Sequence, residues 1–220
     1  MIDPRSTHRR GFLGRVAAAA VALGLPWSRL EARPVAAADP SDHDKWLDGL
    51  KGKYRQLFDS PAPADNLPPL HMLNYLNTYN SAYGVPDQEV NAVGTFYGSV
   101  TLYGVNDAMW AKYRIGEFQK LNDATGQPLA RSPWRGEVHA LGMVIPAASI
   151  EALQKRGVVF ILCNNALNLF SDMLAKARGL ETKAVYEDLK ANLLPGVVLV
   201  PAMVIAIEKA QGKGLAYRRE

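Results

Sequence analysis

Short apolar runs alternate with longer amphipathic segments along most of the chain. The apolar runs predict β-strands, because they are rich in β-branched and aromatic residues and end at turn residues. Residues 158–163 read Val-Val-Phe-Ile-Leu-Cys, and such an uninterrupted run is typical of a strand buried on both faces of a parallel sheet. The expected strands cover residues 90–97, 138–145, 158–163 and 197–200, with weaker candidates at 54–58 and 215–217.

Helices are predicted between these strands, where starts at proline or capping residues and stops at glycine mark their ends. They cover residues 69–83, 107–121, 147–156, 166–178, 182–192 and 202–213. Residues 122–136 predict a long loop. Because strands and helices alternate, right-handed crossovers are expected. The predicted fold class is a three-layer α/β/α domain with a mainly parallel, Rossmann-like sheet.

The first 38 residues have the pattern of an export signal. Two adjacent arginines, Arg9 and Arg10, precede a Phe-Leu pair and an apolar stretch at residues 16–25. A membrane-spanning helix needs about 20 apolar residues, so this shorter stretch indicates a signal peptide. The three alanines at residues 36–38 fit a cleavage site.

The paired arginines resemble a twin-arginine export signal, and an ordinary secretory signal is the alternative. A twin-arginine signal implies contact with that export machinery, a periplasmic mature protein and no stable membrane anchor after cleavage. The expected organisation is a signal peptide at 1–38, a lead-in segment at 39–68 with a possible first strand, and the α/β domain at 69–220.

The basic character of the chain belongs to the signal rather than to the domain. The chain holds 25 basic and 21 acidic residues, and six basic and two acidic ones lie within residues 1–38. The remainder is formally neutral, so a nucleic-acid partner is not expected. With 48% hydrophobic and 21% charged residues, the composition is that of a globular protein.

Several classes of chemistry are excluded by missing residues. Cys163 is the only cysteine, which excludes a disulfide within the chain and a multi-cysteine metal site. The histidines do not have the spacing of metal ligands, so no metal site is predicted. Glycine-rich phosphate loops and the Gly-x-Ser-x-Gly hydrolase motif are absent. No cofactor can be predicted from the sequence.

The candidate site residues follow the expected strands, where parallel sheets bind their ligands. Cys163 comes directly before a predicted helix, and a thiolate there is stabilised by the helix dipole and by free N–H groups. The alternative is that Cys163 is a small buried residue that completes an apolar strand. The ligand-binding residues expected near it are Tyr97, Gly98, Asn164, Asn165, Pro201 and Met203.

His71 is a further ligand-binding candidate, because it starts a helix with two regular faces. Amides recur every three residues on one face, and tyrosines recur every four on another. The amides either line a polar pocket or form a solvated face beside packed tyrosines. The residues concerned are Asn74, Asn77 and Asn80 on the first face and Tyr75, Tyr79 and Tyr83 on the second.

Three segments resemble the DsrE/DsrF-like family. They are QKRGVVFILCNNAL at 154–167, LPGVVLVPAM at 194–203 and KAQGKGLAY at 209–217. The resemblance implies a Rossmann-like parallel sheet and a homo-oligomer. In some members a cysteine carries sulfane sulfur as a persulfide, and that role would fall on Cys163.

These observations leave three functions open. The first is an exported protein that binds or relays sulfane sulfur through Cys163, and the second is a non-catalytic protein that binds a small ligand or cofactor. The third is an oligomeric scaffold. A sulfur exposed in a cleft favours the first function, and a cleft with the sulfur buried behind it favours the second. No cleft at all favours the third.

Overall fold

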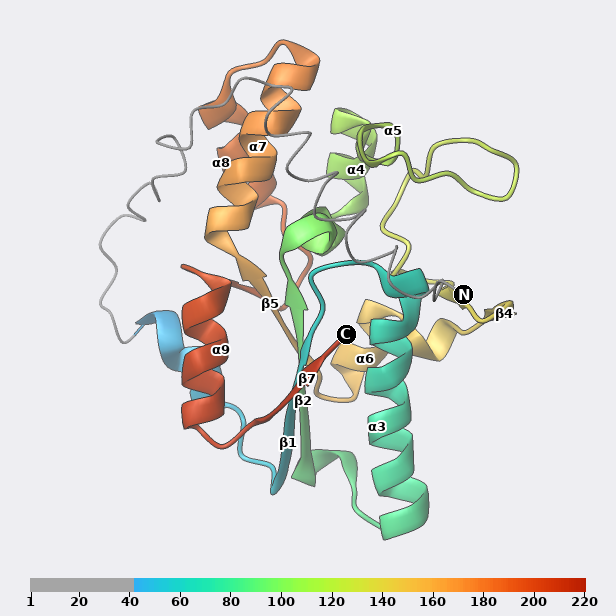
Figure 1. Cartoon of the computed structure of the whole chain (residues 1–220), viewed down its shortest axis with the longest axis vertical. Coiled ribbons are helices and arrows are strands. Elements are labelled where there is room, and N and C mark those ends of the chain that lie inside the picture. The colour runs from blue at the N-terminus through green and yellow to red at the C-terminus, as the bar shows by residue number, and fades with distance from the viewer. Residues whose placement is uncertain (1–41) are drawn as a thin grey trace, which may run out of the picture. The chain divides into compact units, whose positions relative to one another are not determined.

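A parallel five-stranded sheet forms the centre of the fold (Figure 1). The computed structural model describes residues 42–220. The predicted signal, its arginines and its cleavage site lie outside these described residues. The strand order is β6-β5-β2-β1-β7, and every neighbouring pair is parallel. The strands are β1 (Tyr54–Asp59), β2 (Val90–Phe96), β5 (Val159–Cys163), β6 (Val197–Val200) and β7 (Ala216–Arg219).

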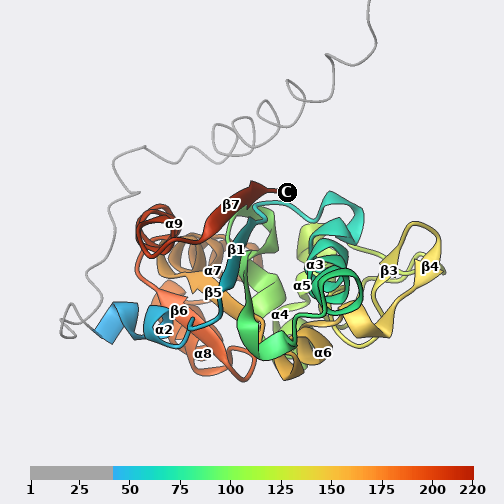
Figure 2. The ribbon, with the colours of Figure 1, turned by 90° about the horizontal axis from the view of Figure 1, so that it is seen from below.

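Helices connect the strands and cover both faces of the sheet, which confirms the predicted three-layer fold class (Figure 2). None of the helices in residues 42–220 is long and apolar enough to cross a membrane. Their bounds are α2 (Lys45–Asp48), α3 (Leu67–Tyr83), α4 (Asp107–Tyr113), α5 (Ile115–Gln119), α6 (Ile150–Lys155), α7 (Asn164–Arg178), α8 (Thr182–Ala191) and α9 (Met203–Gly212).

The two faces of the sheet carry separate hydrophobic cores, because alternate residues of a strand point to opposite sides. The first face packs against α3, α6, α7 and α8, and its centre is the fully buried pair Phe96 and Phe160, whose rings stack at 5.2 Å. The second face packs against α2 and α9 and holds Ile161, Cys163 and Met203. Each buried phenylalanine contributes about 1.5–3 kcal/mol to stability.

The segment expected as a lead-in is part of this domain. Its strand β1, which the sequence predicts at 54–58, lies between β2 and β7 within the sheet. Trp46 and Leu47 of α2 are also buried in the second core. A boundary at residue 68 is therefore wrong for the folded domain, because β1 supplies hydrogen-bonding edges to two other strands.

One predicted strand and one predicted helix are each divided in the structure. Residues 138–145 form the hairpin β3 (His139–Ala140) and β4 (Met143–Val144), which pairs outside the main sheet. Leu141 and Gly142 both take positive φ angles, and this reverses the chain. The helix expected at 107–121 breaks into α4 and α5 at Arg114, where φ is 50°.

Candidate functional site

The candidate site lies at the carboxyl ends of β5 and β6. The helices that follow these two neighbouring strands pack on opposite faces of the sheet. After β5 the chain enters α7, whose Leu167 and Leu174 are buried in the first core. After β6 it enters α9, whose Met203 and Ala206 are buried in the second core. Such a divergence at the carboxyl ends of parallel strands opens the crevice in which these folds bind ligands.

Cys163 lies at this point of divergence. It is the last residue of β5, pairs with Val200 of β6 and occupies the N-cap position of α7. Its Sγ accepts a hydrogen bond of 3.3 Å from the backbone N–H of Met203, the first residue of α9. A sulfur anion at this position would receive both a hydrogen bond and the positive end of the α9 dipole.

Burial limits what Cys163 can reach. Only 6% of the residue is exposed, and it shares the second core with Trp46 and Leu47 of α2. The short helix α2 thus covers the side of the sheet toward which the sulfur points. The thiol is therefore largely shielded from reagents in solution.

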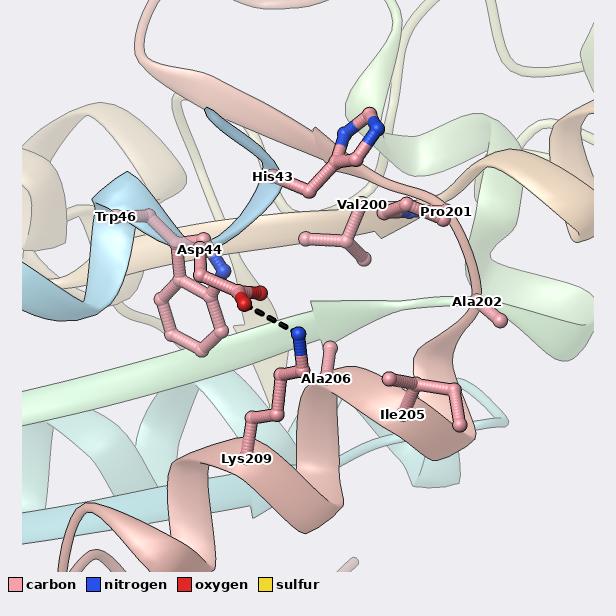
Figure 3. Close-up of a pocket in the computed structure, with 9 residues that line it drawn as sticks. All are labelled: His43, Asp44, Trp46, Val200, Pro201, Ala202, Ile205, Ala206 and Lys209. Carbon is pink, nitrogen blue, oxygen red and sulfur yellow. Dashed lines mark hydrogen bonds and ion pairs between the residues drawn. The ribbon is translucent and has the colours of Figure 1, made fainter. Parts of the chain in front are cut away.

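A small pocket lies at the start of α9 (Figure 3). Its volume is about 140 Å³, and Cys163 is not among the residues that line it. Asp44 and Lys209, which form an ion pair, are both part of its lining. Cys163 is thus buried rather than exposed in this pocket, although its strand partner Val200 is part of the lining. The lining residues are His43, Asp44, Trp46, Val200, Pro201, Ala202, Ile205, Ala206 and Lys209.

The predicted amides beside Cys163 do not hold the sulfur. Asn164 is buried, and its Oδ1 accepts a hydrogen bond of 2.7 Å from the hydroxyl of Tyr186 in α8. Asn165 is exposed. Of the six residues expected near Cys163, Met203 supplies the contact to the sulfur and Pro201 lines the pocket.

Tyr97 belongs to a polar cluster that the sequence pattern does not reveal. The Arg219 Nη1 donates to the Tyr97 hydroxyl at 3.0 Å and to Oδ2 of Asp59 at 2.5 Å. The hydroxyl of Tyr217 donates to the same Asp59 oxygen at 2.6 Å. Burial and the neighbouring Asp59 raise the pKa of Tyr97, and the hydrogen bond to Asp59 raises the pKa of Arg219.

This cluster occupies the carboxyl ends of β1, β2 and β7 on the same face of the sheet as Cys163. Asp59 is only 1% exposed, and its Oδ1 has no hydrogen-bond partner among the described residues. The available signal was an aspartate at the end of the apolar pair Leu57-Phe58. Few residues of that strand are apolar, so the sequence predicted the strand only weakly and did not indicate Asp59 as a site residue.

Gly98 has a structural role at the end of β2. Its φ is +58°, and a Cβ placed there would lie 2.4 Å from the carbonyl oxygen of Pro61. Ser99 donates its backbone N–H to the same Pro61 oxygen at 2.9 Å. A glycine is needed because the two chain segments meet backbone to backbone.

His71 lies away from Cys163, against the first face of the sheet. Its Nδ1 is 2.5 Å from Oε2 of Glu220, whose side chain is almost completely buried. Arg218 binds the other carboxylate oxygen of Glu220 at 2.6 Å. These contacts fasten the end of β7 to α3 rather than forming a pocket with the thiol.

The helix that starts near His71 has a packed tyrosine face. The Tyr75 and Tyr79 rings lie 5.0 Å apart, and those of Tyr79 and Tyr83 lie 5.5 Å apart. On the amide face, Asn77 and Asn80 accept hydrogen bonds from the guanidinium of Arg156. The asparagines of this face are exposed, which fits the solvated face rather than a pocket wall, and Tyr83 at the end of the tyrosine row is 70% exposed. Among residues 42–220, no group of three or more His, Cys, Asp or Glu side chains could hold a metal ion.

Comparison with known proteins leaves the family unassigned. No family model and no curated protein matches the chain. A solved structure of a protein of unknown function, MTH1491 from Methanobacterium thermoautotrophicum, aligns over 76% of this chain and 99% of its own, with 20% identity and a TM-score of 0.36.

Proposed function

We propose that the protein is an exported carrier of sulfane sulfur that holds the sulfur on Cys163. The observation that carries this proposal is the hydrogen bond from the Met203 N–H to Sγ, made at the start of α9 where the strands diverge. A persulfide is an anion at neutral pH, and backbone N–H groups at a helix start favour anions. The resemblance to DsrE/DsrF-like proteins supports the same role.

The transfer step needs no external oxidant or reductant. The Cys163 thiolate attacks the terminal sulfur of a donor persulfide, and a new S–S bond to Sγ forms. The S–S bond of the donor breaks, and the donor leaves as a thiolate with the electron pair of that bond. The proton that Cys163 released is taken up by the leaving thiolate.

Burial of Cys163 is not the exposed arrangement expected of a carrier, so the carrier function requires the thiol to become accessible for loading. A persulfide behind α2 is shielded from oxidants between transfers, because reactive sulfur is oxidised according to its exposure. Loading then requires α2 to open. Opening of α2 exposes Trp46 and Leu47, which are buried in the second core, so the accessible state is reached only by local unfolding of this segment.

Intact-mass measurement tests the carrier function directly. The purified protein is treated with glutathione persulfide and then freed of the reagent. We expect the wild type to gain one sulfur atom that dithiothreitol removes, and Cys163→Ser to gain none. A wild type that gains no sulfur in the native state, although its denatured chain does, would contradict the proposal.

A second measurement tests whether α2 controls access. Lys209→Met removes the ion pair to Asp44, so we expect the native thiol to react faster with Ellman's reagent. Lys176→Met is the matched control, because Lys176 pairs with Asp172 within α7, which does not contact α2 through this pair. Equal labelling rates in the two variants would exclude α2 as the cover that limits loading.

Small-ligand binding is the second candidate function. It is favoured by the pocket at the start of α9 and by the burial of the sulfur. Native mass spectrometry of protein isolated from its own compartment distinguishes the two functions. A retained small molecule that persists in Cys163→Ser supports ligand binding, whereas a bound sulfur that disappears in this variant supports the carrier.

A further inference from the structure

A second and larger pocket is formed by the β3–β4 hairpin and the turn that leads into α3, on the side of the domain away from α9 (Figure 2). Its volume is about 390 Å³, whereas the pocket at the start of α9 has about 140 Å³. Small-molecule sites typically have volumes of about 300–1,000 Å³. The turn contributes Asp65 and Asn66 to the lining, and the hairpin contributes residues 139–143.

This pocket carries a negative charge that has no partner within the described chain. Asp65 is exposed, and no group in residues 42–220 forms an ion pair or a hydrogen bond with its carboxylate. The imidazole of His139 likewise has no partner among these residues. The lining contains neither lysine nor arginine. An unpaired carboxylate in such surroundings favours a ligand that brings a positive charge.

The turn that presents Asp65 has an unfavourable backbone conformation. Ala64, Asp65 and Asn66 have φ angles of 44°, 54° and 61°. This left-handed region disfavours residues that have a Cβ, and three of them follow one another here. Such conformations persist only where the surrounding structure fixes them, and they collect at binding sites.

Asn66 fixes the turn to the hairpin. Its Oδ1 accepts a hydrogen bond of 2.9 Å from Nε1 of Trp134, a fully buried residue. Its Nδ2 donates to the carbonyl oxygen of His139 at 2.9 Å. Both ends of this amide are therefore engaged in holding the two segments together, whereas the carboxylate of Asp65 and the imidazole of His139 stay available to a ligand.

The hairpin adds apolar surface to the same pocket. Leu141 and Met143 belong to the lining and are 67% and 52% exposed. Leu141 also has a positive φ of 53°. Among residues 42–220, six residues other than glycine have positive φ angles, and four of them are Leu141 and the three turn residues at 64–66. Disfavoured conformations are thus concentrated in the two segments that form this pocket.

We propose that this pocket binds a small organic cation whose ammonium group pairs with Asp65 and whose apolar body packs against Leu141 and Met143. A neutral imidazole accepts hydrogen bonds from N–H donors, so His139 provides a second acceptor for the ammonium group. The pairing places a positive group beside the only carboxylate of the lining, and the body covers apolar side chains that solvent otherwise surrounds.

Titrations with two probes of similar size and opposite charge test the preference for a cation. The probes are phenethylammonium and phenylacetate, and the measurement is the change in the amide NMR signals of the isotope-labelled protein. We expect phenethylammonium to cause saturable shifts at residues 65–66 and 139–143. Phenylacetate should cause none there.

Two variants test the charged and the apolar contact separately. Asp65→Asn removes the charge, and asparagine tolerates a positive φ, so we expect phenethylammonium to bind about threefold more weakly, as for the loss of one exposed ion pair. Leu141→Asn should also weaken binding, because the ring loses an apolar contact, while its melting temperature stays equal to that of wild type or rises.

Glu187→Gln is the matched control for the change in charge. Glu187 is exposed on α8 and lies outside the lining, so this variant should bind phenethylammonium as wild type does. The proposal is overturned if wild type shows no saturable binding at millimolar phenethylammonium, if both probes bind equally, or if Asp65→Asn binds unchanged. It does not depend on the sulfur-carrier function, since Cys163 is unchanged in every protein tested.

Discussion

At the scale of single residues, Cys163 contacts the starts of two helices, α7 through its backbone and α9 through its sulfur. Its backbone ends β5 at the N-cap of α7, and its sulfur accepts the first N–H of α9. A helix start leaves four N–H groups without partners inside the helix, and the sulfur satisfies one of them. The contact thus stabilises the fold when the residue is a thiol and favours charge when it carries an anionic sulfur.

Buried tyrosines make stability depend on alkaline pH. Burial raises the pKa of Tyr103, and burial with the neighbouring Asp59 raises the pKa of Tyr97. In the unfolded chain both phenols ionise near pH 10. Their contribution is complete below about pH 10 and is lost as the pH rises through the folded pKa, because the unfolded chain then binds fewer protons.

We expect Tyr103→Phe to flatten the alkaline fall in stability. Phenylalanine keeps the buried ring but removes the titrating group, so the unfolding free energy should decrease less steeply above about pH 10. Urea unfolding at a series of pH values measures this slope. Identical slopes in wild type and variant would show that Tyr103 does not remain neutral in the folded protein.

At the scale of elements, the turn after β2 depends on a close approach of two backbones. Gly98 combines a positive φ with the nearby Pro61 carbonyl oxygen. Gly84, which ends α3, has a similar φ of +65°, but a Cβ added to it would meet nothing within 4 Å. Alanine substitutions at the two glycines therefore separate the free-energy cost of a positive φ angle from that of the steric clash with Pro61.

We expect Gly84→Ala to cost about 1–2 kcal/mol, which is the cost of a left-handed conformation for a residue with a Cβ. Gly98→Ala should cost clearly more, because the chain must also move away from Pro61 and displace Tyr97. Chemical unfolding of both variants provides the comparison. Equal losses would mean that the Pro61 segment moves freely and does not position Tyr97.

At the scale of the whole molecule, the predicted export signal and the folded domain occupy different parts of the chain. The excess of positive charge lies within residues 1–38, and the remainder is formally neutral. Because the remainder is neutral, electrostatic repulsion between copies is weak.

Replacing both Arg9 and Arg10 with lysine tests the export signal. If the signal is of the twin-arginine type, precursor should accumulate in the cytoplasm, because that route requires the paired arginines. Fractionation followed by immunoblotting measures the distribution. Undiminished export of the variant would instead indicate an ordinary secretory signal.

The order and type of most elements could be predicted from the sequence, because their signals are local. The apolar run before Cys163, the caps and the glycine stops lie within a few residues of the structures they specify. The prediction is wrong at 138–145. There the positive φ of Leu141, which its residue type disfavours, turns one expected strand into a hairpin.

Only the tertiary structure decided which side chains meet at the carboxyl edge of the sheet. Arg219 lies 160 residues after Asp59, and Met203 lies 40 residues after Cys163. The order of the strands brings these groups together, since β7 returns beside β1 and α9 starts next to β5. The sequence by itself determined the alternating elements and placed Cys163 at a strand end. Burial of the sulfur, and the polar cluster around Asp59, arise from pairings between distant segments that no local pattern encodes.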